Sequence, residues 1–285
     1  MASFFLVIVV ALLGLTFPLI EMSMQMMDPF LFVSLRFVLA AALLAPFCFG
    51  KIPKVVWTSG ALLGVLNYGG YLTQTIGLAT VNASRAAFLT GTSVVMIPFV
   101  ASLFKMQPLR KRDIMSALIC CLGIYILTGC DTSRISTGDV WILLCALFVA
   151  FSISYIGYLA NLGCDPYLLT LSQIMATAAC SLIPCFLFSD FDLTPLQHLS
   201  TLSVLLYCSL FATILALALQ TKYQKYVSTT KVGLIFCLEP AFATCFDKII
   251  TGRELTYYAL CGGATILFGI LLSELKTQKQ EEQKL

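Results

Sequence analysis

The fold of this chain is decided by two stretches with the same order of residue types: Leu78-Ala-Thr-Val-Asn-Ala-Ser84-Arg-Ala-Ala-Phe-Leu-Thr90-Gly-Thr-Ser-Val-Val-Met-Ile-Pro98 and Tyr226-Val-Ser-Thr-Thr230-Lys-Val-Gly-Leu-Ile-Phe-Cys-Leu-Glu239-Pro240. Each has a small hydroxylic residue before a cation, Ser84-Arg85 or Thr230-Lys231, and then an apolar run that reaches a proline. The two lie 146 residues apart (84 and 230). The same shift relates three further pairs: Gln74 and Gln220, Leu109 and Leu255, Gly123 and Gly269. A fixed shift across several positions indicates an internal duplication.

The composition is that of a membrane protein. Of the 285 residues, 59% are hydrophobic and 11% are charged, whereas about a quarter of the residues of a soluble domain are charged. The 12 cysteines show no C-x-x-C spacing, so we interpret them as small buried hydrophobic residues rather than as disulfides or metal ligands. We expect no cofactor and no metal. We also expect no nucleic-acid partner, since the basic residues are dispersed over short loops.

Ten apolar runs are long enough to cross about 30 Å of hydrocarbon. They are apolar on all sides and longer than barrel strands, so we predict helices. The segment 4–13 resembles a signal sequence but lacks a basic start and a cleavage site, and we interpret it as part of a retained first span. The predicted spans are 4–20, 29–49, 55–79, 84–104, 114–129, 140–159, 166–188, 202–221, 230–250 and 255–273, and residues 276–285 form a polar, frayed cytoplasmic tail.

The distribution of cations predicts the orientation. Four cations fall on one side of the membrane, Arg85, Arg134, Lys248 and Arg253, and Arg36 lies within a span. The other 12 fall on the opposite side, which we expect to be cytoplasmic, with both termini: Lys51, Lys54, Lys105, Arg110, Lys111, Arg112, Lys222, Lys225, Lys231, Lys276, Lys279 and Lys284. We expect a multi-pass protein of a bacterial inner membrane, although an organelle of a eukaryote remains an alternative.

The duplication predicts inverted repeats. Residues 1–137 and 138–275 each hold five spans, and because five is odd the second copy enters the membrane from the opposite face. Early positions agree with a shift of 137 residues, which relates Asp28-Pro29 to Asp165-Pro166 and Arg36 to Gln173. Inverted repeats are a recurring plan of secondary transporters, in which the solute binds near the midplane between the repeats.

Several of these segments also resemble the drug/metabolite transporter superfamily, most closely its EamA-like ten-helix branch. The resemblance covers the whole chain and rests on Gln74-x-x-Gly77-Leu78, Asn82-Ala83-Ser84-Arg85-Ala86-Ala87-Phe88-Leu89-Thr90, Pro98, Leu238-Glu239-Pro240 and Thr251-Gly252-Arg253-Glu254-Leu255-Thr256. It implies an all-α bundle of two inverted five-helix repeats around a central cavity, and transport of amino acids or related metabolites. Export of drugs or toxic metabolites and exchange of S-adenosylmethionine-type metabolites are alternatives of the same fold.

One departure from the family pattern is visible. The first half lacks the glycine and acid before its last helix and reads Lys105-Met106-Gln107-Pro108-Leu109, so the acid occurs only in the second half, at Glu254.

Glu239 is the leading candidate site residue. It lies about 12 Å into its predicted span, where a carboxylate is costly unless it is paired, hydrated or protonated. Pro240 would leave the carbonyl of Phe236 without its helical partner, and we include Phe236 in the candidate site. Glu239 either faces the cavity, contacting a cationic group or coupling transport to protons, or hydrogen-bonds another helix at a kink.

Arg36 is the second deep charge. It either attracts an anionic group such as a substrate carboxylate or forms a salt bridge to Glu21 or Asp28 at the outer mouth. The sequence favours the salt bridge, and we assign Arg36 and Glu21 to gating or ion pairing.

Polar residues on other spans complete the candidate site. Asn67, Tyr71 and Gln74 follow i, i+4, i+7 spacing and share one helix face, which should avoid lipid. By inversion, Gln74 and Gln220 stand at opposite mouths, unless they only hydrogen-bond neighbouring helices. Weaker candidates by the same argument are Thr90, Ser93 and Tyr155.

Two other classes compete with a transporter. A membrane enzyme would need a convergent catalytic set, but the single histidine, His198, lies in a loop beside Asp190 and Asp192. A channel would need a filter-like segment, and none stands out. The sequence specifies neither the substrate, nor the coupling ion, nor the oligomeric state.

Overall fold

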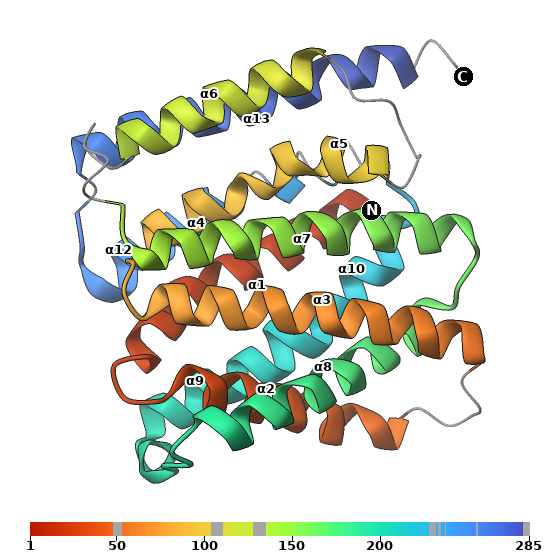
Figure 1. Cartoon of the computed structure of the whole chain (residues 1–285), viewed down its shortest axis with the longest axis vertical. Coiled ribbons are helices and arrows are strands. Elements are labelled where there is room, and N and C mark those ends of the chain that lie inside the picture. The colour runs from red at the N-terminus through yellow and green to blue at the C-terminus, as the bar shows by residue number, and fades with distance from the viewer. Residues whose placement is uncertain are drawn as a thin grey trace.

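The protein is described here by a computed structural model, which covers residues 1–47, 53–103, 111–127, 135–227, 232, 235–236, 238–254 and 256–281. All regular secondary structure in these ranges is helical (Figure 1). The helices are α1 Ala2–Ser23, α2 Pro29–Leu44, α3 Lys54–Leu78, α4 Ala83–Gly91, α5 Ser93–Leu103, α6 Lys111–Leu127, α7 Thr137–Asn161, α8 Pro166–Phe188, α9 Leu199–Ser209, α10 Ala216–Gln224, α12 Glu239–Thr251 and α13 Tyr257–Glu281, with short helical turns at Ala45–Phe47 and Thr194–Gln197 and a π-helical segment at Leu210–Leu215.

Each predicted span contains helix. Five helical segments are both long enough and apolar enough to cross a membrane: Ala2–Ser23, Ala83–Val100, Thr137–Leu159, Pro166–Phe188 and Leu199–Gln224. Three shorter helical segments, Pro29–Leu44, Ile114–Ile126 and Tyr257–Gly269, are also apolar. The prediction of a polytopic all-α membrane protein is therefore confirmed.

Two helices that correspond under the shift of 137 residues begin in the same way. Asp28 accepts a hydrogen bond from the backbone N–H of Leu31 (2.9 Å), and Pro29 occupies the first position of α2. Asp165 accepts from the N–H groups of Tyr167 and Leu168 (2.9 and 3.0 Å), and Pro166 opens α8. An aspartate cap followed by proline satisfies free N–H groups and presets the first helical φ angle.

The structure differs from the predicted spans in three places. The fourth span is two helices, because a turn at Thr92 separates α4 from α5. The eighth contains the π-helical segment Leu210–Leu215 between α9 and α10. The expected frayed tail is helical through Glu281, since α13 continues over lysine, glutamine and glutamate, all of which favour helix.

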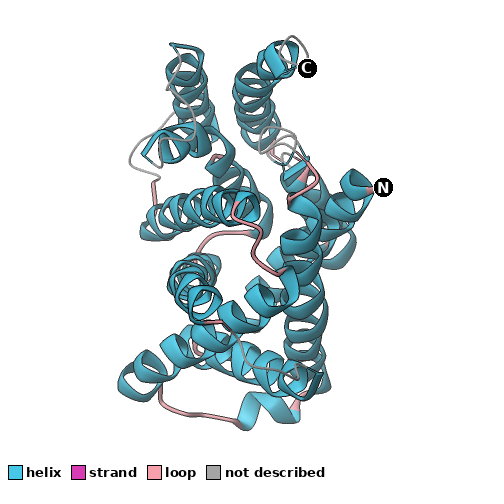
Figure 2. Ribbon diagram, turned by 90° about the vertical axis from the view of Figure 1, so that its right-hand side faces the viewer, coloured by secondary structure: helices cyan, strands magenta, loops and turns pink. Residues whose placement is uncertain are grey.

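The helices run roughly parallel or antiparallel to one another (Figure 1), and α6 and α13 form a pair at one edge of the bundle in both overall views (Figures 1 and 2). The N-terminus and the end of α13 lie at the same end of the helices, on the right in Figure 1. The ends of α1, α3 and α12 and the start of α7 lie at the opposite end. We call this opposite end the distal end.

Contacts between helices repeat under the two sequence shifts. Arg36 of α2 donates to Thr213 (2.8 Å), and at the corresponding positions Gln173 of α8 accepts from Asn67 of α3 (3.1 Å). Between α6 and α13, a Cβ on Gly123 would lie 3.0 Å from the carbonyl oxygen of Gly262, and one on Gly269 would lie 3.2 Å from that of Ser116. Since 116 and 262, like 123 and 269, are 146 apart, these contacts are equivalent.

The direction of the paired helices matches inversion, because α6 and α13 lie side by side and run in opposite directions (Figure 1). Some sequence landmarks of the duplication lie outside the described residues, namely Leu109, Thr230, Lys231, Leu255 and the segment 105–109 that departs from the family pattern.

Candidate functional site

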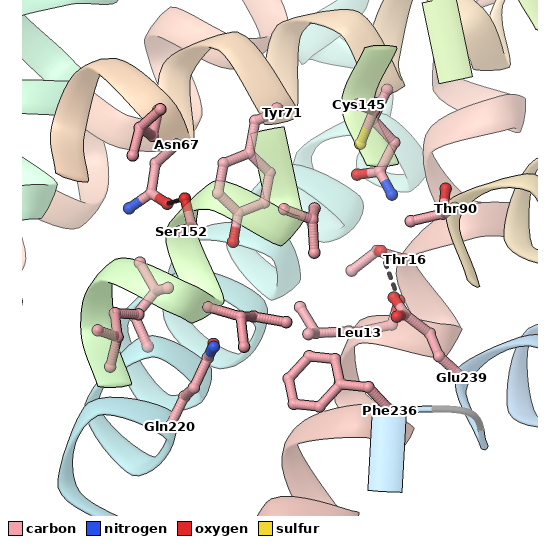
Figure 3. A pocket seen from close by; sticks show the side chains of 17 residues that line it. Leu13, Thr16, Asn67, Tyr71, Thr90, Cys145, Ser152, Gln220, Phe236 and Glu239 are labelled. Atoms are coloured by element: carbon pink, nitrogen blue, oxygen red, sulfur yellow. Dashed lines mark hydrogen bonds between the residues drawn. The ribbon is translucent and has the colours of Figure 1, made fainter. Parts of the chain in front are cut away.

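A cavity with about 660 Å³ of empty space, open solvent included, lies between helices of the two halves (Figure 3). Helices of both halves line it, α1, α3 and α4 from the first and α7, α10 and α12 from the second. Its lining contains pairs related by 146 residues: Tyr71 and Leu217, Gln74 and Gln220, and Thr90 and Phe236. The cavity therefore contains equivalent positions of the two halves.

Seven of the nine residues predicted to bind substrate line this cavity: Asn67, Tyr71, Gln74, Thr90, Gln220, Phe236 and Glu239. Two do not. Ser93 is buried at the position equivalent to Glu239 but is not part of the lining. Tyr155 is also outside the lining, and its ring stacks on Tyr158 with 6.1 Å between centroids.

The sequence reasoning missed the contribution of α1, and on α7 it selected Tyr155 instead of the residues that line the cavity. Leu13 and Thr16 line the cavity from α1, and Cys145, Ser152 and Ile153 line it from α7. Thr16 and Ile153 are 137 residues apart, so they correspond under the same shift as Asp28 and Asp165. Neither was predicted, because each lies in an apolar run without a stripe of polar residues. Knowing that the cavity contains equivalent positions of the halves would have identified them.

Glu239 is the first residue of α12 and is 7% exposed. No hydrogen bond or ion pair to its carboxylate occurs among the described residues. The prediction that Pro240 interrupts a helix is wrong, because Pro240 lies in the first turn of α12, where the missing N–H has no helical acceptor. The carboxylate thus stands at a helix N-terminus, where the positive end of the helix dipole favours a negative charge.

A chain of polar side chains lies behind one wall of the cavity. Asn67 donates to Gln173 (3.1 Å) and accepts from Ser152 (3.3 Å), and Gln173 donates to Thr221 (3.2 Å). These bonds connect α3, α8, α7 and α10. Asn67 is therefore both a lining residue and a structural one.

The two symmetry-related glutamines differ in their contacts. Gln220 donates to Gln224 (3.4 Å), whose amide donates to the carbonyl of Ile153 (2.9 Å). Gln74 has no hydrogen-bond partner among the described residues and lines the cavity. Gln74 is thus free to bind a ligand, while Gln220 is held by Gln224 of its own helix.

Arg36 lies behind the cavity wall and is 1% exposed. Its Nε donates to Thr213 (2.8 Å) and its Nη2 donates to the carbonyl of Ala212 (3.3 Å), both in the π-helical segment. Its Cζ lies 4.5 Å from the centroid of the Tyr71 ring, a cation–π contact. The guanidinium therefore stabilises an irregular stretch of backbone, and Tyr71 stands between it and the cavity.

The predicted pairing of Arg36 with Glu21 or Asp28 is wrong. Asp28 caps α2, and Glu21 instead pairs with Arg253 (2.9 Å) and accepts from the backbone N–H of Ala83 (2.7 Å). Sequence reasoning placed Arg36 near the mouth, but its side chain reaches α9–α10, where the π-helical turn offers carbonyl oxygens.

Ionic contacts join several helices at the distal end. Arg253 lies between Glu21 of α1 and Asp247 of α12 (2.9 and 3.6 Å), and Ser84 of α4 donates to Asp247 (2.6 Å). We call Glu21, Ser84, Asp247 and Arg253 the distal cluster. Hydrogen bonding to Glu21 raises the pKa of Arg253, so this contact favours the charged guanidinium.

A second ionic contact lies beside the distal cluster. Arg85 of α4 binds Asp139 of α7 through two parallel hydrogen bonds of 2.7 Å, the strongest geometry for such a pair. Asp139 also caps its own helix by accepting from the N–H of Ser136 (2.8 Å). α1, α4, α7 and α12 are thus bound together at this end.

Comparison with known proteins identifies the class of this fold and site. The model of the EamA-like transporter family matches residues 1–129 and 136–275. The chain therefore belongs to the EamA-like transporter family, in agreement with the resemblance seen in the sequence.

Individual relatives are also named as transporters. An uncharacterized transporter of Archaeoglobus fulgidus is 31% identical over 272 residues, which cover 95% of this chain and 85% of the relative. The uncharacterized transporter YxxF of Bacillus subtilis is 25% identical over 254 residues, covering 84% and 79%. A crystal structure with 18% identity superposes with a TM-score of 0.70 over 98% of both chains, which supports the fold. The protein is thus a multi-pass membrane protein of a transporter family.

Proposed function

We propose that the protein is a secondary transporter that moves a small organic solute by alternating access, with residues 1–137 and 138–275 as its two inverted repeats. The observation that supports this most directly is the cavity, which contains equivalent positions of both halves, Gln74 with Gln220 and Thr90 with Phe236. When inverted repeats exchange conformations, a site shared between them can open to either side in turn. Amino acids and related metabolites are the first solutes to test.

The distal cluster represents one closed end in this cycle. Arg253 and Ser84 join α1, α4 and α12 there, while Arg85 joins α4 to α7. Solute release on the distal side requires these contacts to separate. Gating thus involves Glu21, as the sequence suggested, but its partner is Arg253 rather than Arg36.

The proposal is tested by counterflow in liposomes. Purified protein is loaded with a panel of unlabelled amino acids, amines and nucleoside-like metabolites, and saturable uptake of the labelled compound is measured. Leu217→Trp should abolish uptake because Leu217 lines the cavity. Leu215→Trp is the matched control, since Leu215 is exposed on the bundle surface two residues earlier. Ion-like conductance without saturation would indicate a channel instead.

The enzyme alternative has little support in the described part of the chain. His198 and Asp192 are exposed, and no group of three or more possible metal ligands occurs among the described residues. Thr194 donates to Asp192 through its hydroxyl (2.7 Å) and its backbone N–H (2.9 Å), which holds the pKa of Asp192 below its usual range. The side chain of Asp192 therefore stabilises a turn.

A further inference from the structure

Among the described residues, Glu239 is the one charged side chain in the cavity lining. This carboxylate is buried and has no hydrogen-bond or ion-pair partner among the described residues. A buried charge without a partner is strongly destabilising. The dipole of α12 supplies only a partial positive charge, and no described side chain supplies a full one, so a cationic group of a ligand is the natural partner.

The nearby cations are engaged elsewhere. Arg36 donates into the π-helical segment and lies behind Tyr71. Arg85 is bound by Asp139, and Arg253 belongs to the distal cluster. None of these three residues lines the cavity, so an anionic group on a ligand would find no positive side chain among the described lining residues.

A second polar group in the cavity lacks a partner. The hydroxyl of Thr90 is buried and makes no hydrogen bond, although most buried polar atoms are satisfied. Figure 3 shows Thr90 and Thr16 on the same side of the cavity as Glu239, opposite Asn67 and Ser152. Thr16 is satisfied by the carbonyl of Leu13 (2.6 Å). On this side of the cavity, the polar groups that make no hydrogen bond among the described residues are the Glu239 carboxylate and the Thr90 hydroxyl.

The remaining lining suits the body of an organic cation. The rings of Phe236 and Tyr71 and the aliphatic side chains of Leu13 and Ile153 face the cavity, and aromatic faces attract cationic groups. The free amide of Gln74 can bind one neutral polar group.

Building on the proposed function, we propose that the transported solute is an organic cation with a single positive charge, an amine or onium compound, whose charged group binds between Glu239 and Thr90. Glu239 balances the charge and Thr90 accepts a hydrogen bond from an ammonium group. Zwitterions and anions bind less well, because a carboxylate on the ligand has no cationic partner in the described part of the lining.

The test uses sets of compounds that share one body and differ in charge. One set is 2-phenylethylamine, phenylalanine and 3-phenylpropanoate; another is choline and its neutral carbon analogue, 3,3-dimethylbutan-1-ol. Binding to the purified full-length protein is measured by calorimetry, and counterflow is measured in liposomes. We expect the cation of at least one set to bind at least about tenfold more tightly than its zwitterionic, neutral or anionic counterparts, the ratio that one unpaired charge readily provides.

Variants identify the residues responsible. Glu239→Gln should weaken binding of the cation about tenfold or more and leave that of the neutral analogue unchanged, and Thr90→Val should weaken it several-fold. Glu254→Gln is the matched control, because Glu254 is an exposed carboxylate paired with Lys248 outside the cavity. Size-exclusion chromatography establishes that each variant is folded, and Thr90→Val provides an independent test if Glu239→Gln is not.

Several results would overturn the proposal. One is tighter binding of the zwitterion or anion than of the cation, and another is cation binding that Glu239→Gln leaves unchanged. The others are stabilisation of the protein by sodium chloride but by no organic cation, and no binding of any compound. Saturable counterflow of a neutral or zwitterionic solute that Leu217→Trp abolishes would refute the charge assignment and leave the transport function intact. Absence of counterflow for every compound, with measurable cation binding, would instead contradict the transport function.

Discussion

At the scale of single residues, buried amides and hydroxyls join four helices behind the cavity. Gln173 contacts Asn67 and Thr221 at the same time, and hydrogen bonds of this kind contribute about 0.6–2 kcal/mol each in membrane bundles. We therefore expect Gln173→Leu to lower the free energy of unfolding by about 1–3 kcal/mol. Unfolding in mixed detergent, followed by circular dichroism, measures this difference.

The control for that substitution lies on the same helix. Ser181 of α8 is equally buried, but its hydroxyl donates only to the carbonyl of Ala178 in its own helix (2.7 Å). Ser181→Ala should change stability far less than Gln173→Leu. Equal effects of the two substitutions would show that the interhelical amide bonds are unimportant for stability.

Residue types and spacing were sufficient to predict seven of the 17 lining residues, but not the contacts of each side chain. Asn67, Tyr71 and Gln74 were found from the polar stripe on one helix face, and Glu239 from the cost of a buried charge. The partners of Arg36 could not be predicted, because the carbonyl of Ala212 becomes available only through a π-helical turn. Such a turn leaves no signature in an apolar run.

At the scale of elements, two glycines control how closely α6 and α13 approach. A Cβ on Gly123 would lie 2.8 Å from the backbone nitrogen of Ile266, and one on Gly269 would lie 2.8 Å from the Sγ of Cys120. Backbone atoms cannot rotate away, so Gly123→Ala must separate the helices. We expect it to cost about 1–3 kcal/mol, as overpacking does, measured as a lower midpoint of thermal unfolding.

Gly70→Ala tests whether alanine itself is responsible. Gly70 lies inside α3, and the nearest neighbouring atom to an added Cβ would be 3.5 Å away, an ordinary contact. Replacing a helical glycine by alanine without a clash should raise stability by up to about 1 kcal/mol. If Gly123→Ala and Gly70→Ala shift the midpoint in the same direction, close packing of α6 on α13 is not what Gly123 provides.

The helix ends were predicted best where a capping residue marks them. Asp28-Pro29 and Asp165-Pro166 gave the starts of α2 and α8 within one residue. The turn at Thr92 and the start of α12 at Glu239 were missed, although Thr90-Gly91-Thr92-Ser93 and Glu239-Pro240 contain residues that favour a helix break, because each was included in one continuous span. Hydropathy identifies a membrane span, whereas breaks within it depend on packing against the other half.

At the scale of the whole molecule, ion pairing sharpens the predicted orientation. At the distal end Arg85, Lys248 and Arg253 each pair with a carboxylate. The opposite end bears Lys54 and Lys111, the first residues of α3 and α6. We expect a green fluorescent protein fused after residue 285 to fluoresce in the bacterial cytoplasm, and alkaline phosphatase fused after Asp190 to be active. The reverse pattern would refute the orientation.

Alternating access requires the closed distal end to open during the transport cycle. Arg253 joins α1 to α12 through Glu21 and Asp247, so Arg253→Gln should loosen the distal end and expose the cavity from that side. Cys145 lines the cavity and is 2% exposed, so its modification by a membrane-impermeant maleimide, mapped by mass spectrometry in intact cells, reports this opening. Lys248→Gln is the control, because Lys248 and Glu254 are both largely exposed and such pairs contribute little. We expect several-fold faster labelling in Arg253→Gln alone; equal rates in both variants would mean that the distal cluster does not hold the transporter closed.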